Sequence, residues 1–206
     1  MVSNCFAIIL AAGRSGRMGQ EKAGLPWLDG LPLLHWMAEA LLAAGWEPRI
    51  VLGPQHIDDW RNILPAEWLV LNPNPEAGKT TSIAAGAANV PNSAEWILMS
   101  AVDQPRPPAL YRRLRDEAGL YKESILVPER AGRRDHPLVL RGTLRQRLLT
   151  LSEETGGLRG LLNEEAGNVR LLTNCMPEWL GWDLNTHDAY EDALRHFQAL
   201  PPDLRV

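Results

Sequence analysis

Short apolar runs alternate along this chain with longer segments whose apolar residues recur at helical spacing. The apolar runs predict buried strands, and the helical spacing predicts amphipathic helices between them. The predicted strands cover residues 5–10, 49–52, 68–71, 96–100, 124–128, 138–141 and 169–173, and a charged turn is expected at residues 129–135. The predicted helices cover residues 32–45, 57–64, a segment beginning at 80–82, 108–119, 142–151, a short stretch near 153–160, and 187–198. A hydroxyl of Thr80, Thr81 or Ser82 is expected to cap the helix that begins there.

Strands that alternate with helices are typical of a doubly wound, mostly parallel α/β sheet. We expect a single domain over residues 1–200, with a loose tail after it. Residues 1–105 would form a nucleotide-binding part, and residues 106–200 would complete the sheet and bind the acceptor. Ligands of such sheets bind beyond the carboxyl ends of the strands.

Composition narrows the class of protein. The 206 residues are 45% hydrophobic, enough for a sizeable core, and the net charge of −4 disfavours a general nucleic-acid binder. The two cysteines, Cys5 and Cys175, have no spacing typical of a zinc site or a disulfide framework. No charged leader precedes an apolar run, and no apolar stretch has transmembrane length, so we expect a cytoplasmic protein without a membrane partner.

The segment 8–22 carries the strongest chemical signal. It leaves the first predicted strand through small residues and glycines, among which lie three cations, Arg14, Arg17 and Lys22. Backbone N–H groups can approach a ligand closely where glycine removes the Cβ atom, and fixed positive charge around them suits a polyphosphate.

Two common phosphate motifs do not fit this chain. A dinucleotide fingerprint would require glycine where Ser15 stands. The run Gly78-Lys79-Thr80 supplies the second half of a Walker motif, but Pro73 occupies the position of its first glycine.

Carboxylates that follow apolar segments are candidate metal ligands. Asp103 comes directly after a predicted buried strand, and Asp183 follows a later apolar segment. Magnesium is commonly held by one or two carboxylates together with phosphate oxygens. The alternative interpretation of Asp103 is a helix cap or a turn residue, and that of Asp183 is a cap of the last helix beside Asn185 and Thr186.

The first loop resembles the nucleotidyltransferase signature L-A-A-G-x-S-x-R-M-G-x-x-K at every fixed position, from Leu10 to Lys22. Four later segments extend this resemblance to the MobA-like nucleotidyltransferase superfamily, and within it to the molybdenum cofactor cytidylyltransferases. These segments are Gly78-x-x-x-Ser82-Ile83-x-x-Gly86, Asp103-Gln104-Pro105, His136-Pro137 and Asp183-Leu184-Asn185-Thr186, with Gly157-Leu158-Arg159-Gly160 similar to a further family region.

The resemblance implies Mg²⁺-dependent transfer of CMP from CTP to the phosphate of molybdopterin, with release of pyrophosphate. It implies catalytic roles for Arg17, Lys22 and Asp103, metal binding by Asp103 and Asp183, and acceptor binding by His136 and Arg159. An apo-enzyme of the molybdenum hydroxylase type is a further expected partner. The expected nucleotide contacts are Leu10, Ala11, Ala12, Gly13, Arg14, Ser15, Gly16, Arg17, Lys22, Thr81, Ser82 and Asp103.

The chain departs from the family pattern at three positions. Val102 replaces a glycine before Asp103, Lys79 replaces the usual methionine, and Asp135 replaces the glycine before His136. A carboxylate at position 135 would repel an anionic acceptor. Ala12 favours cytidylyl transfer, because guanylyl-transferring members tend to have glycine there.

Alternative functions remain open from the sequence. Guanylyl transfer to the same cofactor, or nucleotidyl transfer to a sugar phosphate, would use the same chemistry. A non-catalytic carrier that delivers molybdopterin to an apo-enzyme is an alternative of a different class. Arg17, Lys22 and Asp103 favour an enzyme, since a carrier does not need all three.

Overall fold

The computed structural model of the protein describes residues 4–13, 21–173, 180–201 and 204. In these ranges an 8-stranded sheet has the order β3-β2-β1-β4-β7-β5-β6, and β8 pairs with the far side of β5. The strands are β1 (Cys5–Leu10), β2 (Glu47–Leu52), β3 (Leu69–Leu71), β4 (Trp96–Ala101), β5 (Ile125–Arg130), β6 (Arg133–Arg134), β7 (Leu138–Arg141) and β8 (Val169–Leu172).

The predicted α/β class is confirmed, and the sheet is parallel in its first half. β1 pairs in parallel with β2 and with β4, whereas β7 runs antiparallel to both β4 and β5. The structure adds one feature to the prediction. The segment 129–135, expected as a charged turn, contains a hairpin in which β5 pairs with β6. Ala131 and Gly132 turn this hairpin with φ angles of 51° and 77°.

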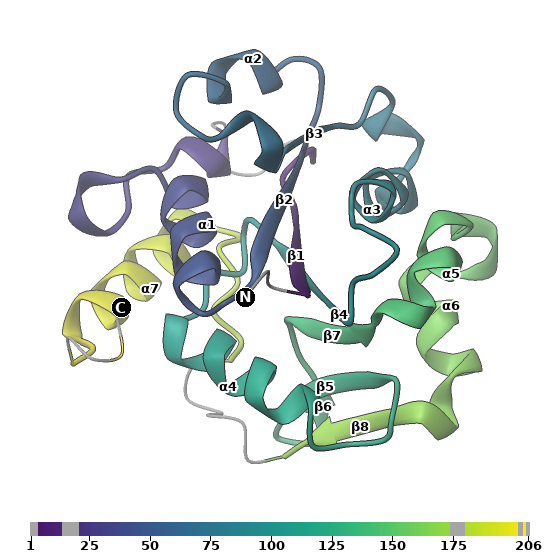
Figure 1. Cartoon of the computed structure of the whole chain (residues 1–206). Coiled ribbons are helices and arrows are strands. Elements are labelled where there is room, and N and C mark those ends of the chain that lie inside the picture. The colour runs from purple at the N-terminus through teal and green to yellow at the C-terminus, as the bar shows by residue number, and fades with distance from the viewer. Residues whose placement is uncertain (1–3, 14–20, 174–179, 202–203, 205–206) are drawn as a thin grey trace.

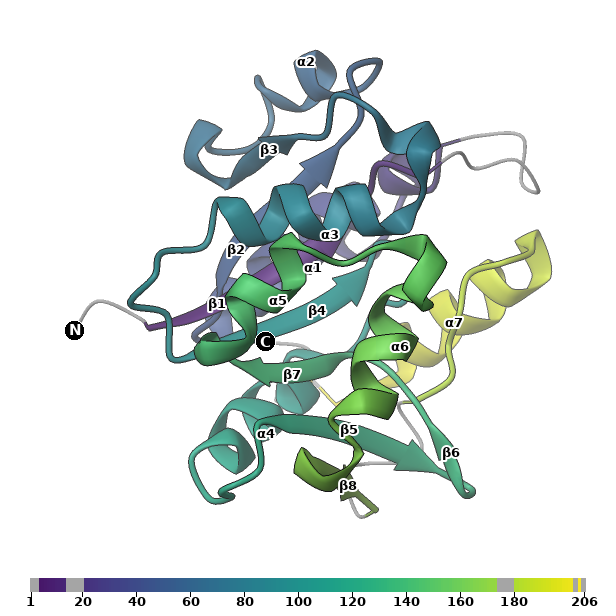
Figure 2. The same cartoon turned by 90° about the vertical axis from the view of Figure 1, so that its right-hand side faces the viewer.

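Helices cover both faces of the sheet (Figure 1). They are α1 (Leu33–Ala43), α2 (Ile57–Trp60), α3 (Lys79–Ala88), α4 (Pro108–Ala118), α5 (Arg145–Leu149), α6 (Gly157–Glu164) and α7 (His187–Ala199). α1, α4 and α7 pack on one face, and α3, α5 and α6 pack on the other (Figures 1 and 2). Alternate residues of β1 serve the two cores: Ala7 and Ile9 face the first, and Ile8 and Leu10 face the second. Among the described helices, none combines the length and apolar character required to cross a bilayer.

An aromatic cluster fixes α7 on the first face. The Phe197 ring lies 5.2 Å from Trp27, 5.3 Å from Trp36 and 5.0 Å from Trp182 between centroids. Such pairs add stabilisation beyond the apolar area that they bury. The cluster also anchors the segment before α7, which runs past the end of β4, where the backbone N–H of Leu184 donates to the carbonyl of Asp103 at 2.8 Å.

Helix α3 begins differently from the expectation that Thr80, Thr81 or Ser82 would cap it. It begins at Lys79, and its N-cap residue is Gly78, whose φ of 118° favours glycine. A remote carboxylate supplies the side-chain cap instead, because the N–H of Thr80 donates to Oε1 of Glu153 at 2.8 Å. The prediction of a local hydroxyl cap was therefore wrong.

Close packing of α3 on β1 depends on Gly86. A Cβ atom at this position would lie 2.5 Å from Cγ2 of Ile8 and 3.1 Å from Cγ2 of Val51. Glycine thus allows the helix to approach the central strands, and this approach places the first turn of α3 beside the loop that leaves β1.

We expect Gly86→Ala to lower the free energy of unfolding by about 1–3 kcal/mol through overpacking, although alanine is otherwise the better helix former. Urea denaturation followed by tryptophan fluorescence would measure this change. Gly167→Ala is the matched control, since no atom lies within 4 Å of its added Cβ, and we expect a change within about 0.5 kcal/mol. Equal stability of the two variants would contradict this account of the α3 contact.

Candidate functional site

The carboxyl ends of β1 and β4 meet at the centre of the sheet. Leu10 pairs with Ala101, and the N–H of Val102 donates to the carbonyl of Leu10. The chain leaves β1 toward α1 on one face and reaches β4 from α3 on the other, so this is the switch point at which doubly wound sheets bind ligands.

A cavity of about 370 Å³ and another of about 330 Å³ open at this edge of the sheet. The smaller one, here called the loop cavity, begins at the backbone after β1 and extends to the start of α3. Its lining residues are Leu10, Ala12, Gly13, Lys22, Pro75, Gly78, Lys79, Ser82, Ala101, Val102 and Asp103.

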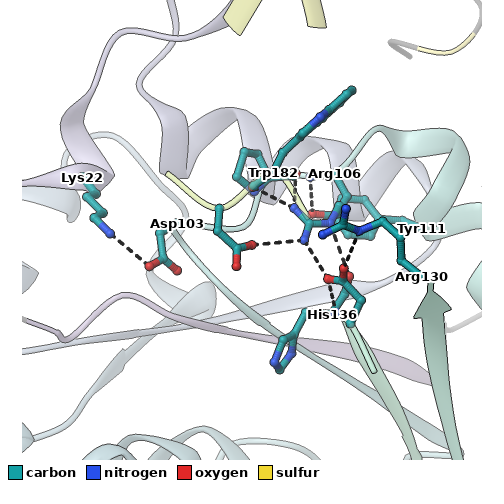
Figure 3. A network of polar contacts seen from close by, with 10 residues as sticks. Lys22, Asp103, Arg106, Tyr111, Arg130, His136 and Trp182 are labelled. Carbon is teal, nitrogen blue, oxygen red and sulfur yellow. Dashed lines mark hydrogen bonds and ion pairs between the residues drawn. The ribbon is translucent and has the colours of Figure 1, made fainter. Parts of the chain in front are cut away.

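The loop cavity contains an ion pair between residues far apart in the sequence. Nζ of Lys22 lies 3.0 Å from Oδ2 of Asp103 (Figure 3). The same nitrogen lies 3.3 Å from Oδ1 of Asn185. The Asp103 side chain is 29% exposed, so it can still reach a ligand. The structure therefore brings Gly13, Lys22 and Asp103 to one cavity.

The predicted nucleotide contacts do not all lie at the loop cavity. Leu10, Ala12, Gly13 and Ser82 line the loop cavity, whereas the adjacent Ala11 side chain belongs to the core on the opposite face. Arg14, Ser15, Gly16 and Arg17 lie outside the described residues, and their predicted roles stay predictions.

The hydroxyl of Thr81 stabilises the loop before α3. Its hydroxyl lies 2.8 Å from the carbonyl of Gly78 and 3.1 Å from that of Asn74, and it accepts from Nδ2 of Asn72 at 2.9 Å. The buried Asn72 amide also donates to Oγ of Ser82 at 2.9 Å. Thr81 is not among the residues described as lining either cavity, so its geometry indicates a structural role.

The larger cavity, here called the hairpin cavity, lies between α3, α6 and the β5–β6 hairpin. It is lined by Lys79, Thr80, Ile83, Arg134, Asp135, His136, Leu138, Glu153, Gly156, Gly157, Leu158, Arg159 and Leu162. Both predicted acceptor contacts, His136 and Arg159, are in this set. Burial lowers the pKa of His136 below its ordinary value, and the positive charges of Lys79 and Arg106 act in the same direction.

Arg106, to which no sequence motif pointed, lies at the centre of the polar network (Figure 3). Its side chain is 0% exposed. Three carbonyl oxygens and two carboxylate oxygens accept from the guanidinium: those of His136 (3.3 Å), Pro105 (3.0 Å) and Trp182 (2.9 Å), and Oδ1 of Asp135 (3.2 Å) and of Asp183 (3.4 Å). All five N–H donors of the arginine thus have an acceptor. A charged residue within the run Pro105-Arg106-Pro107 was the available sequence signal.

The polar network gives Asp135 and Asp183 surroundings that differ from those expected from the sequence. Asp135, expected to repel an anionic acceptor, is neutralised by Arg106 and by Nε of Arg130 at 3.4 Å. Asp183 does not cap the last helix, because the hydroxyl of Thr186 accepts from the N–H of Ala189 and so provides that cap. Asp183 is 40% exposed and pairs with Arg106, so one face of it remains accessible.

Replacement of Arg106 by methionine should lower the free energy of unfolding by about 3–5 kcal/mol, because buried acceptors lose their partner. Urea denaturation would measure this loss. Arg195→Met is the matched control: its side chain is 65% exposed, and its described ion pairs, with Glu191 and Asp192, lie at the surface of α7, so we expect a change within about 0.5 kcal/mol. Similar losses in the two variants would count against the network.

The lowered pKa of His136 predicts a pH dependence of stability. Between its pKa in the folded state and about 6.5, the unfolded chain binds a proton that the folded chain does not, so acidification through this window destabilises the fold. His136→Gln removes this contribution. The free energy of unfolding should therefore fall more between about pH 7.5 and about pH 5 in the original protein than in the variant. Equal falls in the two proteins would refute the assignment.

Comparison with known proteins places the chain among relatives with different names. It is 32% identical to 2-C-methyl-D-erythritol 4-phosphate cytidylyltransferase of Nocardia farcinica, over 58% of this chain and 54% of the relative. It is 34% identical to molybdenum cofactor guanylyltransferase of Xanthomonas euvesicatoria, over 48% of this chain and 46% of the relative. The chain thus spans about half the length of these two relatives.

A longer alignment joins the chain to nicotine blue oxidoreductase of Paenarthrobacter nicotinovorans, with 32% identity over 87% of this chain and 91% of the relative. Among solved structures, Rv0371c of Mycobacterium tuberculosis aligns with a TM-score of 0.75 and 26% identity, over 95% of this chain and 99% of that one. A structure of Rv0371c in complex with manganese aligns with a TM-score of 0.70 and 25% identity, over 93% and 98% of the two chains.

The names of the three sequence relatives give three different activities. The family model described as the MobA-like NTP transferase domain matches residues 7–169. This range includes the loop after β1, Asp103 and all the lining residues named above for the two cavities. The chain belongs to the MobA-like NTP transferase domain family.

Proposed function

We propose that the protein transfers CMP from CTP to the phosphate of a molybdopterin-type acceptor and releases pyrophosphate. The observation that carries this proposal is the pair of adjoining cavities. One contains the Lys22–Asp103 pair at the switch point of the sheet, and the other is lined by cations.

The loop cavity suits a nucleoside triphosphate. Backbone after β1 approaches it at Gly13, and Lys22 supplies a positive charge beside it. Lys22 and the predicted contact Arg17 would offset the charge that develops on the leaving pyrophosphate.

The oxygen atoms at this cavity fit a hard divalent cation. Asp103, which lines the cavity, would hold it together with Asp183. Asp183 is not one of the lining residues, but it directly precedes Leu184, whose N–H donates to the carbonyl of Asp103. The amide oxygen of Asn185 lies near Lys22, the partner of Asp103. Two carboxylates suffice for magnesium that is bound largely through phosphate oxygens. When bound, the metal would supply charge neutralisation at the triphosphate and hold its geometry.

The hairpin cavity suits an anionic acceptor. Lys79, Arg134 and Arg159 line it with positive charge, and Arg106 and Arg130 neutralise the Asp135 carboxylate. The Glu153 carboxylate is held at the positive end of α3. The remaining charge therefore favours a phosphate group.

The reaction needs little covalent chemistry from the protein. An oxygen of the acceptor phosphate attacks the α-phosphorus in line, and the bond from that phosphorus to the β-phosphate bridging oxygen breaks. A phosphate monoester is largely deprotonated above its second pKa of about 6, so no side chain has to remove a proton. Positioning by the two cavities and charge stabilisation supply the catalysis.

The identity of the nucleotide base and of the acceptor is proposed from single residues and from the names of relatives. Ala12, which lines the loop cavity, favours CTP on the family pattern described above. The relatives named for cytidylyl and for guanylyl transfer keep GTP as the alternative, and the Nocardia relative keeps a sugar phosphate as an alternative acceptor. A molybdenum hydroxylase apo-enzyme as a downstream partner stays a prediction.

A pyrophosphate-release assay of four nucleoside triphosphates against molybdopterin, with and without Mg²⁺, tests the proposal. We expect CTP to give the highest turnover, only with the metal, and mass spectrometry to find the cytidine dinucleotide product. Binding of molybdopterin without affinity for any nucleotide would instead indicate a carrier. Absence of turnover with every pair would reject nucleotidyl transfer to this acceptor.

Asp103→Ala should lower kcat by about 10²–10³-fold, because the variant loses a group that organises the metal and triphosphate. Its circular dichroism and unfolding midpoint should remain close to those of the original protein. Asp116→Ala is the matched control, since that side chain is 65% exposed on α4 away from both cavities, and it should retain full turnover. Undiminished pyrophosphate release by Asp103→Ala would remove the metal role.

A further inference from the structure

Lys79 lies where the two cavities meet. It is the residue that lines both of them within the described part of the chain, and it is the first residue of α3. Gly78, with its φ of 118°, turns the backbone into the helix immediately before it. This places an exposed ammonium group at the boundary between the proposed triphosphate site and the proposed acceptor site.

The local structure leaves this charge available. Within the described ranges, no carboxylate lies within ion-pair distance of the Lys79 ammonium group. The nearby Glu153 carboxylate accepts from the backbone N–H of Thr80 instead. The run Gly78-Lys79-Thr80 also lacks the first glycine of a Walker loop, so that motif does not account for the lysine.

Phosphoryl chemistry across this boundary presents an electrostatic problem. A phosphate monoester carries a charge of about −1.5 to −2 near neutral pH, and it must approach a phosphorus atom whose own oxygens are negative. A lysine ammonium group is a compact charge on a flexible stem with three rotatable donors. It can therefore contact oxygens of both groups as they approach.

We infer that Lys79 is a catalytic residue that contacts the α-phosphate of the nucleotide and the phosphate of the acceptor together, and so selects phosphate monoesters as acceptors. This inference rests on the proposed function and adds a residue and a substrate class to it. The lysine keeps its proton throughout. The new bond joins the acceptor oxygen to the α-phosphorus, and the electron pair of the broken bond leaves with pyrophosphate.

Amine labelling tests the shared contact without requiring turnover. The chain has three lysines, Lys22, Lys79 and Lys122, which peptide mass spectrometry can follow separately. With CTP and Mg²⁺ as one probe and molybdopterin as the other, Lys79 should be protected by each probe alone. Lys22 should be protected by the nucleotide only, and the exposed Lys122 by neither. Protection of Lys79 by one probe only, or by neither, would overturn the inference.

Kinetics test its catalytic part. Lys79→Met should lower kcat/KM for the acceptor by about 10²-fold, as expected for loss of one charged contact to the transition state, while Kd for CTP changes less than about threefold. Lys79→Arg should restore much of the activity, and Lys122→Met is the matched control that should retain it. Equal losses in nucleotide affinity and turnover would make Lys79 a triphosphate ligand only, and unchanged turnover would remove its role.

Different results would reject the proposed function and the role of Lys79. If the original protein released no pyrophosphate with any nucleotide and molybdopterin, the proposed function would be rejected, while the labelling pattern would still decide whether Lys79 faces both ligands. If the original protein were active and Lys79→Met equally active, only the inference about Lys79 would be wrong.

Discussion

The arrangement of the site depends on the hydrogen bonds and ion pairs that the buried guanidinium of Arg106 makes. The guanidinium joins the loop after β4, the turn before β7 and the segment before α7, which are far apart in the sequence. An arginine in the protein interior is tolerable only when its donors are satisfied, and here five acceptors surround it. The same contacts hold Asp183 near the end of β4 and remove the charge of Asp135 from the hairpin cavity.

The sheet provides the second constraint. Parallel pairing of β4 beside β1 brings the loop at Gly13 and the carboxylate of Asp103 to one edge. Helix α3 approaches that edge because Gly86 has no side chain, and its first turn then forms a wall of both cavities. Within the part of the chain that the structure describes, the proposed triphosphate site and the proposed acceptor site thus share one lining residue, Lys79.

Much of the fold could be predicted from sequence, because the signals were local. The apolar run of β1 and the position of Asp103 directly after β4 depend on residues adjacent in the chain. Contacts between distant segments could not be predicted in the same way. The cap that Glu153 provides for α3 crosses 73 positions, and the partners of Arg106 lie up to 77 positions away. The structural use of the Thr81 hydroxyl likewise depends on how the preceding loop folds back.

We propose that the backbone at Gly13 and the Asp103 carboxylate together hold the nucleotide. A crystal structure with a non-hydrolysable CTP analogue and Mn²⁺, with the metal located by anomalous scattering, tests it most directly. We expect the triphosphate beside Gly13 and Lys22 in the loop cavity, with the metal bound to Asp103. A triphosphate bound elsewhere, or an Asp103 carboxylate directed away from the metal, would contradict it.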